Sequence, residues 1–128
     1  MWPFRKMDIG DLVEALHARD TKRLIAGLSY RRANDPDAVV VRSYAADQLK
    51  KLGGLAGQGA AQALVVAMRG DEKAYVRASA AKALAVMRPL WGAAALQAFQ
   101  AATLDSDAGV RGAAVLCLGS SGQSVVVC

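Results

Sequence analysis

A short pattern that occurs three times constrains the fold of this chain more than any other feature. Its clearest copy is Val76–Leu84, where Val-Arg is followed by small residues at offsets four and five and by leucine at offset eight. Similar offsets follow Val41 and Val110, so the copies lie 35 and 34 residues apart. Self-similarity at a period of about 20–50 residues is typical of stacked helical repeats rather than of a single closed core.

The composition of the chain fits a core of closely packed helices. Apolar residues make up 54% of the 128 residues, but aromatic residues make up only 5%. Ala, Leu and Val therefore have to fill the core, and small residues at offsets four and five let neighbouring helices approach closely. The length predicts one domain.

The hydrophobic spacing predicts a short amphipathic helix at 8–18, which caps the repeats, and an arm before it that carries Trp2 and Phe4. We expect the arm to cover this helix; contact with a lipid interface is the alternative. The sequence has no signal-peptide pattern and no uncharged apolar run suited to a membrane. Cys117 and Cys128 are too few for a disulfide framework. A soluble, cytoplasmic protein without a membrane partner is therefore expected.

Three helix pairs are predicted after the cap. In the first pair, Pro36 ends the preceding segment and Gly53 favours a helix end, so the second helix is expected from about Ala38 to Leu52. The second helix of the next pair is expected to end around Met87-Arg88. The predicted segments are 1–19 for the arm and cap, 20–54, 55–88 and 89–122 for the three repeats, and 123–128 for the tail.

The repeat pattern decays after Leu118. Three valines at 125–127 occupy the place where a fourth repeat would begin, although the end of a solenoid normally carries a polar outer face. Three interpretations stay open: the valines fold back over the third repeat, they join two chains into a homo-oligomer, or the chain is a shortened version of a longer array. Cys128 is expected to be reactive through exposure or to cross-link two chains, whereas Cys117 is expected to pack inward.

The second copy of the pattern resembles the HEAT-like repeats of bacterial proteins, including phycobilin lyase subunits. The resemblance rests on Val-Arg-x-x-Ala-Ala-x-Ala-Leu at 76–84 after a turn that contains Asp71. It covers about residues 20–122 and is looser in the first repeat, where the turn is longer. It implies an all-α, right-handed α-solenoid of about three helix pairs with an N-terminal capping helix.

The same resemblance implies a structural role for several charged residues. In such families the Asp of the turn and the Arg after Val form a ladder of polar contacts between successive repeats. These positions are thereby assigned to structure rather than to catalysis. They are Asp37, Arg42, Asp71, Arg77, Asp107 and Arg111, with Asp105 as the alternative to Asp107.

The sequence lacks catalytic and metal-binding patterns. His17 is the single histidine, and no His-Glu dipeptide is present, although HEAT-like hydroxylases need such pairs to bind iron. The glycines from Gly53 to Gly59 lack the Lys-Ser/Thr ending of a phosphate-binding loop. We therefore expect neither enzyme activity nor a cofactor nor a metal.

Nucleic-acid binding is the main alternative to protein binding. The net charge is +5, and the resemblance extends to HEAT-like DNA glycosylases, which grip the DNA backbone with a basic face. Residues 1–51 nevertheless net only +3, from ten basic and seven acidic residues. The basic residues at issue are Lys22, Arg23, Arg31, Arg32, Lys50 and Lys51.

We predict a non-enzymatic protein-interaction scaffold whose second helices line an inner surface, with a protein partner docked across it. A lyase-like or chaperone subunit for a tetrapyrrole-carrying protein is a further alternative, which would need a partner subunit because no nucleophile is evident. The positions expected to be exposed and to contact the partner are Ser43, Gln48, Ala78, Ser79, Lys82 and Gly112.

Overall fold

The computed structural model describes residues 6–119, which are helical apart from their turns. The arm with Trp2 and Phe4, the valine tail and Cys128 lie outside this range, so the expectations about them stay predictions. The helices are α1 Ile9–His17, α2 Thr21–Leu28, α3 Ala38–Leu52, α4 Gly57–Gly70, α5 Ala74–Ala85, α6 Ala93–Ala102 and α7 Ala108–Gly119, with 3-10 turns η2 at Gly53–Ala56 and η3 at Arg88–Leu90.

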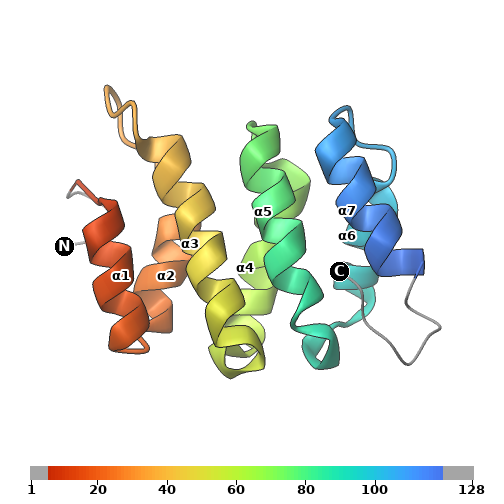
Figure 1. The fold of residues 1–128 in the computed structure, drawn as a ribbon, viewed down its shortest axis with the longest axis horizontal. Helices are drawn as coiled ribbons and strands as arrows, with labels where there is room; N and C mark the ends of the chain where they lie inside the picture. Colours follow the sequence, from red (N-terminus) through yellow and green to blue (C-terminus); the bar gives the residue numbers. More distant parts are fainter. Residues whose placement is uncertain (1–5, 120–128) are drawn as a thin grey trace.

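The helices are stacked in two layers (Figure 1). Helices α1, α3, α5 and α7 lie side by side in one layer, and α2, α4 and α6 lie behind them. Each helix contacts its neighbours in its own layer, and between the layers α1 and α3 contact α2, α5 contacts α4 and α7 contacts α6. This arrangement confirms the predicted all-α solenoid of helix pairs.

Helix α1 covers the side of α3 that faces away from α5. A capping box fixes its start: the Asp11 amide donates to Asp8 Oδ1 at 3.0 Å and the Asp8 amide donates to Asp11 Oδ2 at 2.9 Å. Its apolar face buries Leu12 against the stack. Gly27 of α2 allows this close packing, because a Cβ there would lie 2.8 Å from Ala45 Cβ and 2.9 Å from Leu12 Cδ2.

Alanine and leucine form the core between repeats, as the composition indicates. Ala45, Ala80 and Ala114, at offset four of the three copies, are fully buried. At offset eight, Leu49 and Leu84 are fully buried as well. Small side chains bring the helices together and the leucines fill the layer between them.

Helix α5 ends two residues earlier than its sequence predicts. It stops at Ala85, and the next residues form η3, where Pro89 fits because the first turn of a helix does not need its missing amide. Trp91 then closes the connection to α6: its Nε1 donates to the Leu84 carbonyl at 2.7 Å, and its ring centroid lies 4.5 Å from that of Phe99.

Candidate interaction surface

A buried ion pair joins the first repeat to the second. Arg42 on α3 donates from Nε to Asp71 Oδ2 at 2.8 Å and from Nη2 to Asp71 Oδ1 at 3.3 Å. The Arg42 side chain is 2% exposed and that of Asp71 is 1% exposed. Arg42 Nη1 also donates to the Tyr30 carbonyl at 3.2 Å. These contacts tie α3 to the turn that precedes α5.

The same contact recurs between the second repeat and the third. Arg77 on α5 donates from Nε and from Nη2 to the two oxygens of Asp105, both at 2.9 Å. The guanidinium of Arg77 lowers the pKa of the Asp105 carboxyl. Arg111 on α7 hydrogen-bonds to the backbone of the turn: its Nη1 donates to the Asp105 carbonyl at 2.8 Å and to the Ser106 carbonyl at 3.1 Å.

Two of the acidic residues assigned to the ladder lie elsewhere. Asp107 accepts from the Val110 amide at 3.1 Å and so caps α7, whereas Asp105 pairs with Arg77. Asp37 precedes α3, but its side chain accepts no capping hydrogen bond. The structure therefore selects Asp105, the alternative, over Asp107, and it places the Asp37 side chain outside the ladder, because the carboxylate that meets the arginine belongs to the first Asp of the turn and not to the last.

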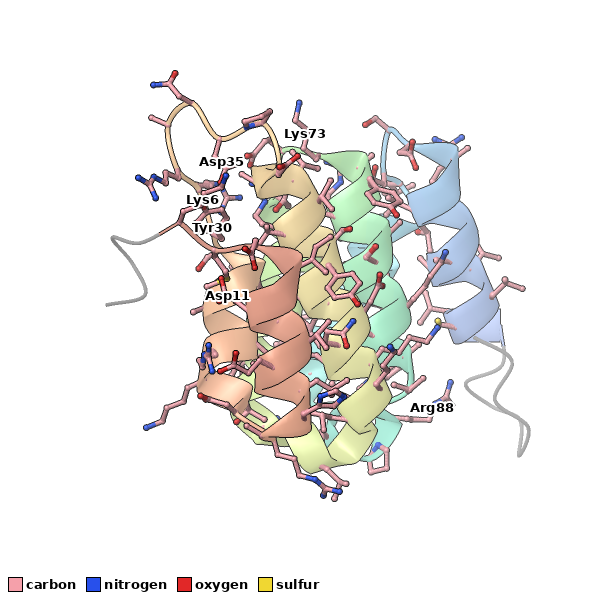
Figure 2. The ribbon with its side chains drawn as sticks, turned by 60° about the vertical axis from the view of Figure 1, so that its left-hand side comes forward. Lys6, Asp11, Tyr30, Asp35, Lys73 and Arg88 are labelled. Atoms are coloured by element: carbon pink, nitrogen blue, oxygen red, sulfur yellow. The ribbon has the colours of Figure 1, made fainter. Side chains whose placement is uncertain are left out.

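The turn itself identifies the correct acidic residues. Asp35, Asp71 and Asp105 each accept, through Oδ1, the amide of the residue two positions later, at 3.0, 2.9 and 2.9 Å. Such a turn places the carboxylate at one geometric position in every repeat. In the first repeat this carboxylate faces the Tyr30 hydroxyl, which donates to it (Figure 2). The sequence signal was the first Asp of Asp-Pro-Asp at 35–37 and of Asp-Ser-Asp at 105–107.

Arg31 is held by carboxylates rather than free for phosphate contacts. Its Nη2 lies 3.0 Å from Glu72 Oε2 and 3.3 Å from Asp71 Oδ2. This contact lowers the pKa of Glu72 to about 2. In the sequence Arg31 is only one member of a basic cluster. Its pairing with Asp71 and Glu72 arises because the long turn of the first repeat lies beside the turn of the second repeat in the folded chain.

The exposed residues of the second helices form one narrow stripe. On α3 the stripe contains the exposed Val40 and Lys51 and the half-buried Tyr44 and Asp47, whose spacing of four, three and four residues keeps them on one helix face. The corresponding positions of α5 include Tyr75, which is 66% exposed, together with Lys82 and Val86.

The structure corrects half of the expected contact positions. Ser43, Gln48 and Ser79 are buried, so the prediction that they are exposed is wrong. Ala78 is half-buried, and Lys82 and Gly112 are exposed. The reason is that α3 has α1 on one side and α5 on the other, so that only the stripe that faces outward stays accessible to solvent.

A groove of about 510 Å³ opens beside this stripe, along the C-terminal half of α3 and next to the end of α5. Gln48 lies in its wall with 1% of its surface exposed, and its Nε2 has no hydrogen-bond partner. Partial burial raises the pKa of Asp47, although Lys50, Lys82 and Lys51 act in the opposite direction. The groove is lined by Tyr44, Asp47, Gln48, Lys50, Lys51 and Val86.

The layer of first helices carries two smaller apolar grooves. One, of about 340 Å³, lies between α2 and α4, and the other, of about 410 Å³, lies between α4 and α6. Both are lined in part by Val66, which is 71% exposed. Small apolar side chains dominate their walls, so they offer little to select a ligand.

Nothing in residues 6–119 has the form of a metal site, since no group of three or more His, Cys, Asp or Glu side chains gathers there. His17 is exposed in the last turn of α1, and Cys117 is fully buried in α7. None of the helices in the described part has the length and apolarity needed to cross a membrane. The arrangement is suited to binding through shape and charge.

Comparison with known families finds a match over the second half of the chain. Residues 61–127, more than half of the chain, match the family model described as HEAT repeats. No curated protein and no solved structure matches the chain.

Proposed function

Because the chain belongs to the HEAT-repeat family, we propose that it is a protein-interaction scaffold whose partner binds across the second helices α3, α5 and α7. HEAT repeats are commonly protein-interaction scaffolds. The observation that carries the proposal is the stripe of tyrosine, valine and charged side chains on α3 and α5. Aromatic side chains are enriched in protein interfaces, and polar side chains surround the apolar centre as a rim.

The stripe crosses two neighbouring helices whose relative position is fixed. The buried pair of Arg42 with Asp71 holds α3 against the turn before α5. A partner laid across the layer would therefore meet Tyr44 and Tyr75 in a preformed arrangement, which lowers the entropy lost on binding. Among the positions that the sequence suggested, Ala78, Lys82 and Gly112 remain proposed contacts on this face.

The basic residues of the first half favour a protein partner over nucleic acid. Arg23 lies 3.5 Å from Glu14 and 3.8 Å from Asp20 in ion pairs, and Arg31 is paired with Glu72. Cations whose charge is compensated by carboxylates attract phosphates weakly.

Site-specific photo-crosslinking tests the proposed face. Benzoylphenylalanine replaces Tyr75 on the stripe in one variant and Val66, on the opposite layer, in the matched control. In an extract of the source cells, crosslinked proteins identified by mass spectrometry are expected at position 75 and not at position 66. Crosslinks at neither position, or at position 66 alone, would overturn the proposal.

The lyase-like alternative stays a prediction with a simple test of its own. Mixing the protein with a free bilin and a bilin-carrying acceptor protein, and recording the absorbance spectrum, detects any attachment or binding. An unchanged spectrum rejects this alternative and leaves the scaffold.

A further inference from the structure

The groove beside Gln48 contains charges and an unused donor that the packing of the helices does not explain. We propose that it binds an acidic segment of the partner protein, with carboxylates toward the lysines and the peptide backbone against Gln48 and Asp47. The proposal rests on the proposed function and specifies the chemistry of the partner.

The charge around the groove is unbalanced toward positive. Lys50 and Lys51 line it, and the charge of Lys82 on the neighbouring helix α5 acts to lower the pKa of Asp47 in its wall. Within residues 6–119 none of these three lysines forms an ion pair, and neither does Asp47. Three cations against one carboxylate leave a net positive charge that attracts an anionic group.

Gln48 supplies the second, independent observation. Its side chain is almost fully buried in the wall of the groove, and its Nε2 has no acceptor. A buried donor without a partner destabilises the folded state, and such groups are rare in native proteins. The terminal amide rotates easily because its last torsion has a broad energy profile. A backbone carbonyl in the groove would accept the hydrogen bond that the helices leave unmade.

The remaining walls match a peptide better than a nucleic acid. Tyr44 and Val86 offer apolar surface for a side chain, and Asp47 offers an acceptor for a backbone N–H. A peptide provides an acceptor, a donor and carboxylates together, whereas a phosphate backbone provides acceptors only. The volume of about 510 Å³ is within the range of pockets that hold small ligands or a few side chains.

Fluorescence anisotropy with the full chain tests the proposal. The probes are a fluorescein-labelled peptide of alternating Glu and Leu, a peptide of equal length with Gln in place of Glu, and a labelled single-stranded oligonucleotide. At about 50 mM salt, where screening is weak, the Glu peptide is expected to bind at least about tenfold more tightly than the Gln peptide.

Two triple variants that lose the same charge distinguish an effect of the groove cations from an effect of the overall net charge. K50Q/K51Q/K82Q removes the cations around the groove and is expected to weaken binding of the Glu peptide by about tenfold or more. The control K22Q/R69Q/K73Q removes three exposed cations that do not line the groove, and it is expected to leave binding nearly unchanged. Lys73 lies at the opposite end of α5 from Arg88 (Figure 2), which keeps it away from the end of α5 that borders the groove.

Gln48→Leu tests the contribution of the Gln48 amide donor apart from that of the lysine charges. This variant keeps a side chain of similar size, so the thermal unfolding midpoint is expected to stay the same or to rise, while affinity for the Glu peptide falls by about fivefold. Unchanged affinity in Q48L, an equal loss of affinity in the two triple variants, or no binding of the Glu peptide would each overturn the proposal. Tighter binding of the oligonucleotide, lost in K50Q/K51Q/K82Q, would identify a phosphate site and overturn it too.

The outcomes also separate this proposal from the proposed function. If position 75 still crosslinks to a partner while the Glu peptide fails to bind, the scaffold stands and the acidic-segment proposal is rejected. If position 75 gives no crosslink, the proposed function itself is rejected.

Discussion

The two junctions between repeats use the same arginine contact in different surroundings. At the first junction the side chains of Arg42 and Asp71 are 2% and 1% exposed, whereas at the second those of Arg77 and Asp105 are 14% and 13% exposed. Arg111, the third copy, is exposed and donates hydrogen bonds to the backbone carbonyls of Asp105 and Ser106. The same sequence pattern therefore gives a buried ion pair, a partly exposed ion pair and a set of backbone hydrogen bonds, and the position of each copy in the stack decides which of the three forms.

The difference follows from what covers each arginine. The long first turn adds Arg31, which reaches Asp71 and Glu72 and closes the first junction from outside. At the second junction the Asp105 carboxylate accepts hydrogen bonds from Arg77 and from the Asp107 amide, and within residues 6–119 no second arginine pairs with it as Arg31 does with Asp71. Burial removes water from the first pair, so a broken contact there cannot be replaced by hydration.

Arg42→Met is expected to have the largest effect. It leaves the buried Asp71 carboxylate without its main partner, and loss of one member of a buried pair costs about 3–5 kcal/mol of unfolding free energy. Urea denaturation followed by circular dichroism measures the loss. The double variant R42M/D71L removes both charges and is expected to lose less. A loss below about 1 kcal/mol in R42M would show that Arg31 holds Asp71 on its own.

Gly27→Ala tests the other side of α3, where close packing rather than charge holds the stack. The added methyl group would overlap Ala45 and Leu12, and overpacking of this kind costs about 1–3 kcal/mol. The same urea titration measures it. Gly59→Ala is the matched control on α4, because its nearest neighbour, Ile25 Cδ1, lies at an ordinary 4.0 Å. Equal stability of the two variants would contradict the close approach.

Arg77→Met is expected to destabilise the fold less than Arg42→Met does. Asp105 is partly exposed, so water can solvate it when the arginine is gone, and the expected loss is about 1–2 kcal/mol. Comparing the denaturation midpoints of R77M and R42M at pH 7 measures the difference between the junctions. A larger loss in R77M would reverse the comparison.

Acid is expected to weaken the second junction through Asp105. The pKa of Asp105 is lower in the folded chain than its ordinary value of 3.8, so its contribution is present above pH 4 and is lost as the pH falls through the lowered pKa. Glu72, with a pKa of about 2 against 4.5, acts in the same direction. Unfolding free energy should fall below about pH 4, and the fall should be shallower in R77M. Identical slopes would remove Arg77 as the cause.

Gly112→Ala is expected to have the smallest effect, in the stabilising direction. Gly112 is exposed on α7, and a Cβ there would meet nothing within 4 Å. Replacing a helical glycine with alanine is expected to stabilise by up to about 1 kcal/mol. A rise in the thermal unfolding midpoint checks this, and a fall would mean that α7 needs the glycine.

Much of the fold could be predicted because its rules are local. The bounds predicted for α3 agree with the structure, since Gly53 marks its end and apolar spacing marks its face. The apolar spacing predicts an end of α5 two residues later than the structure shows, because this spacing does not reveal the turn that leads from Ala85 to the 3-10 turn with Pro89. The candidate site was harder: Lys82 and Gly112 were placed correctly on the surface, whereas Gln48 was not.

The sequence by itself determined the repeated helices, the small residues that let them pack, and the arginines that join one repeat to the next. Tertiary structure alone decided that Gln48 is buried with an unpaired amide, that Asp105 rather than Asp107 meets Arg77, and that Arg31 closes the first junction. Helix periodicity follows from backbone geometry within a few residues. Burial and pairing depend on which distant segments the folded chain brings alongside, and no local pattern contains that information.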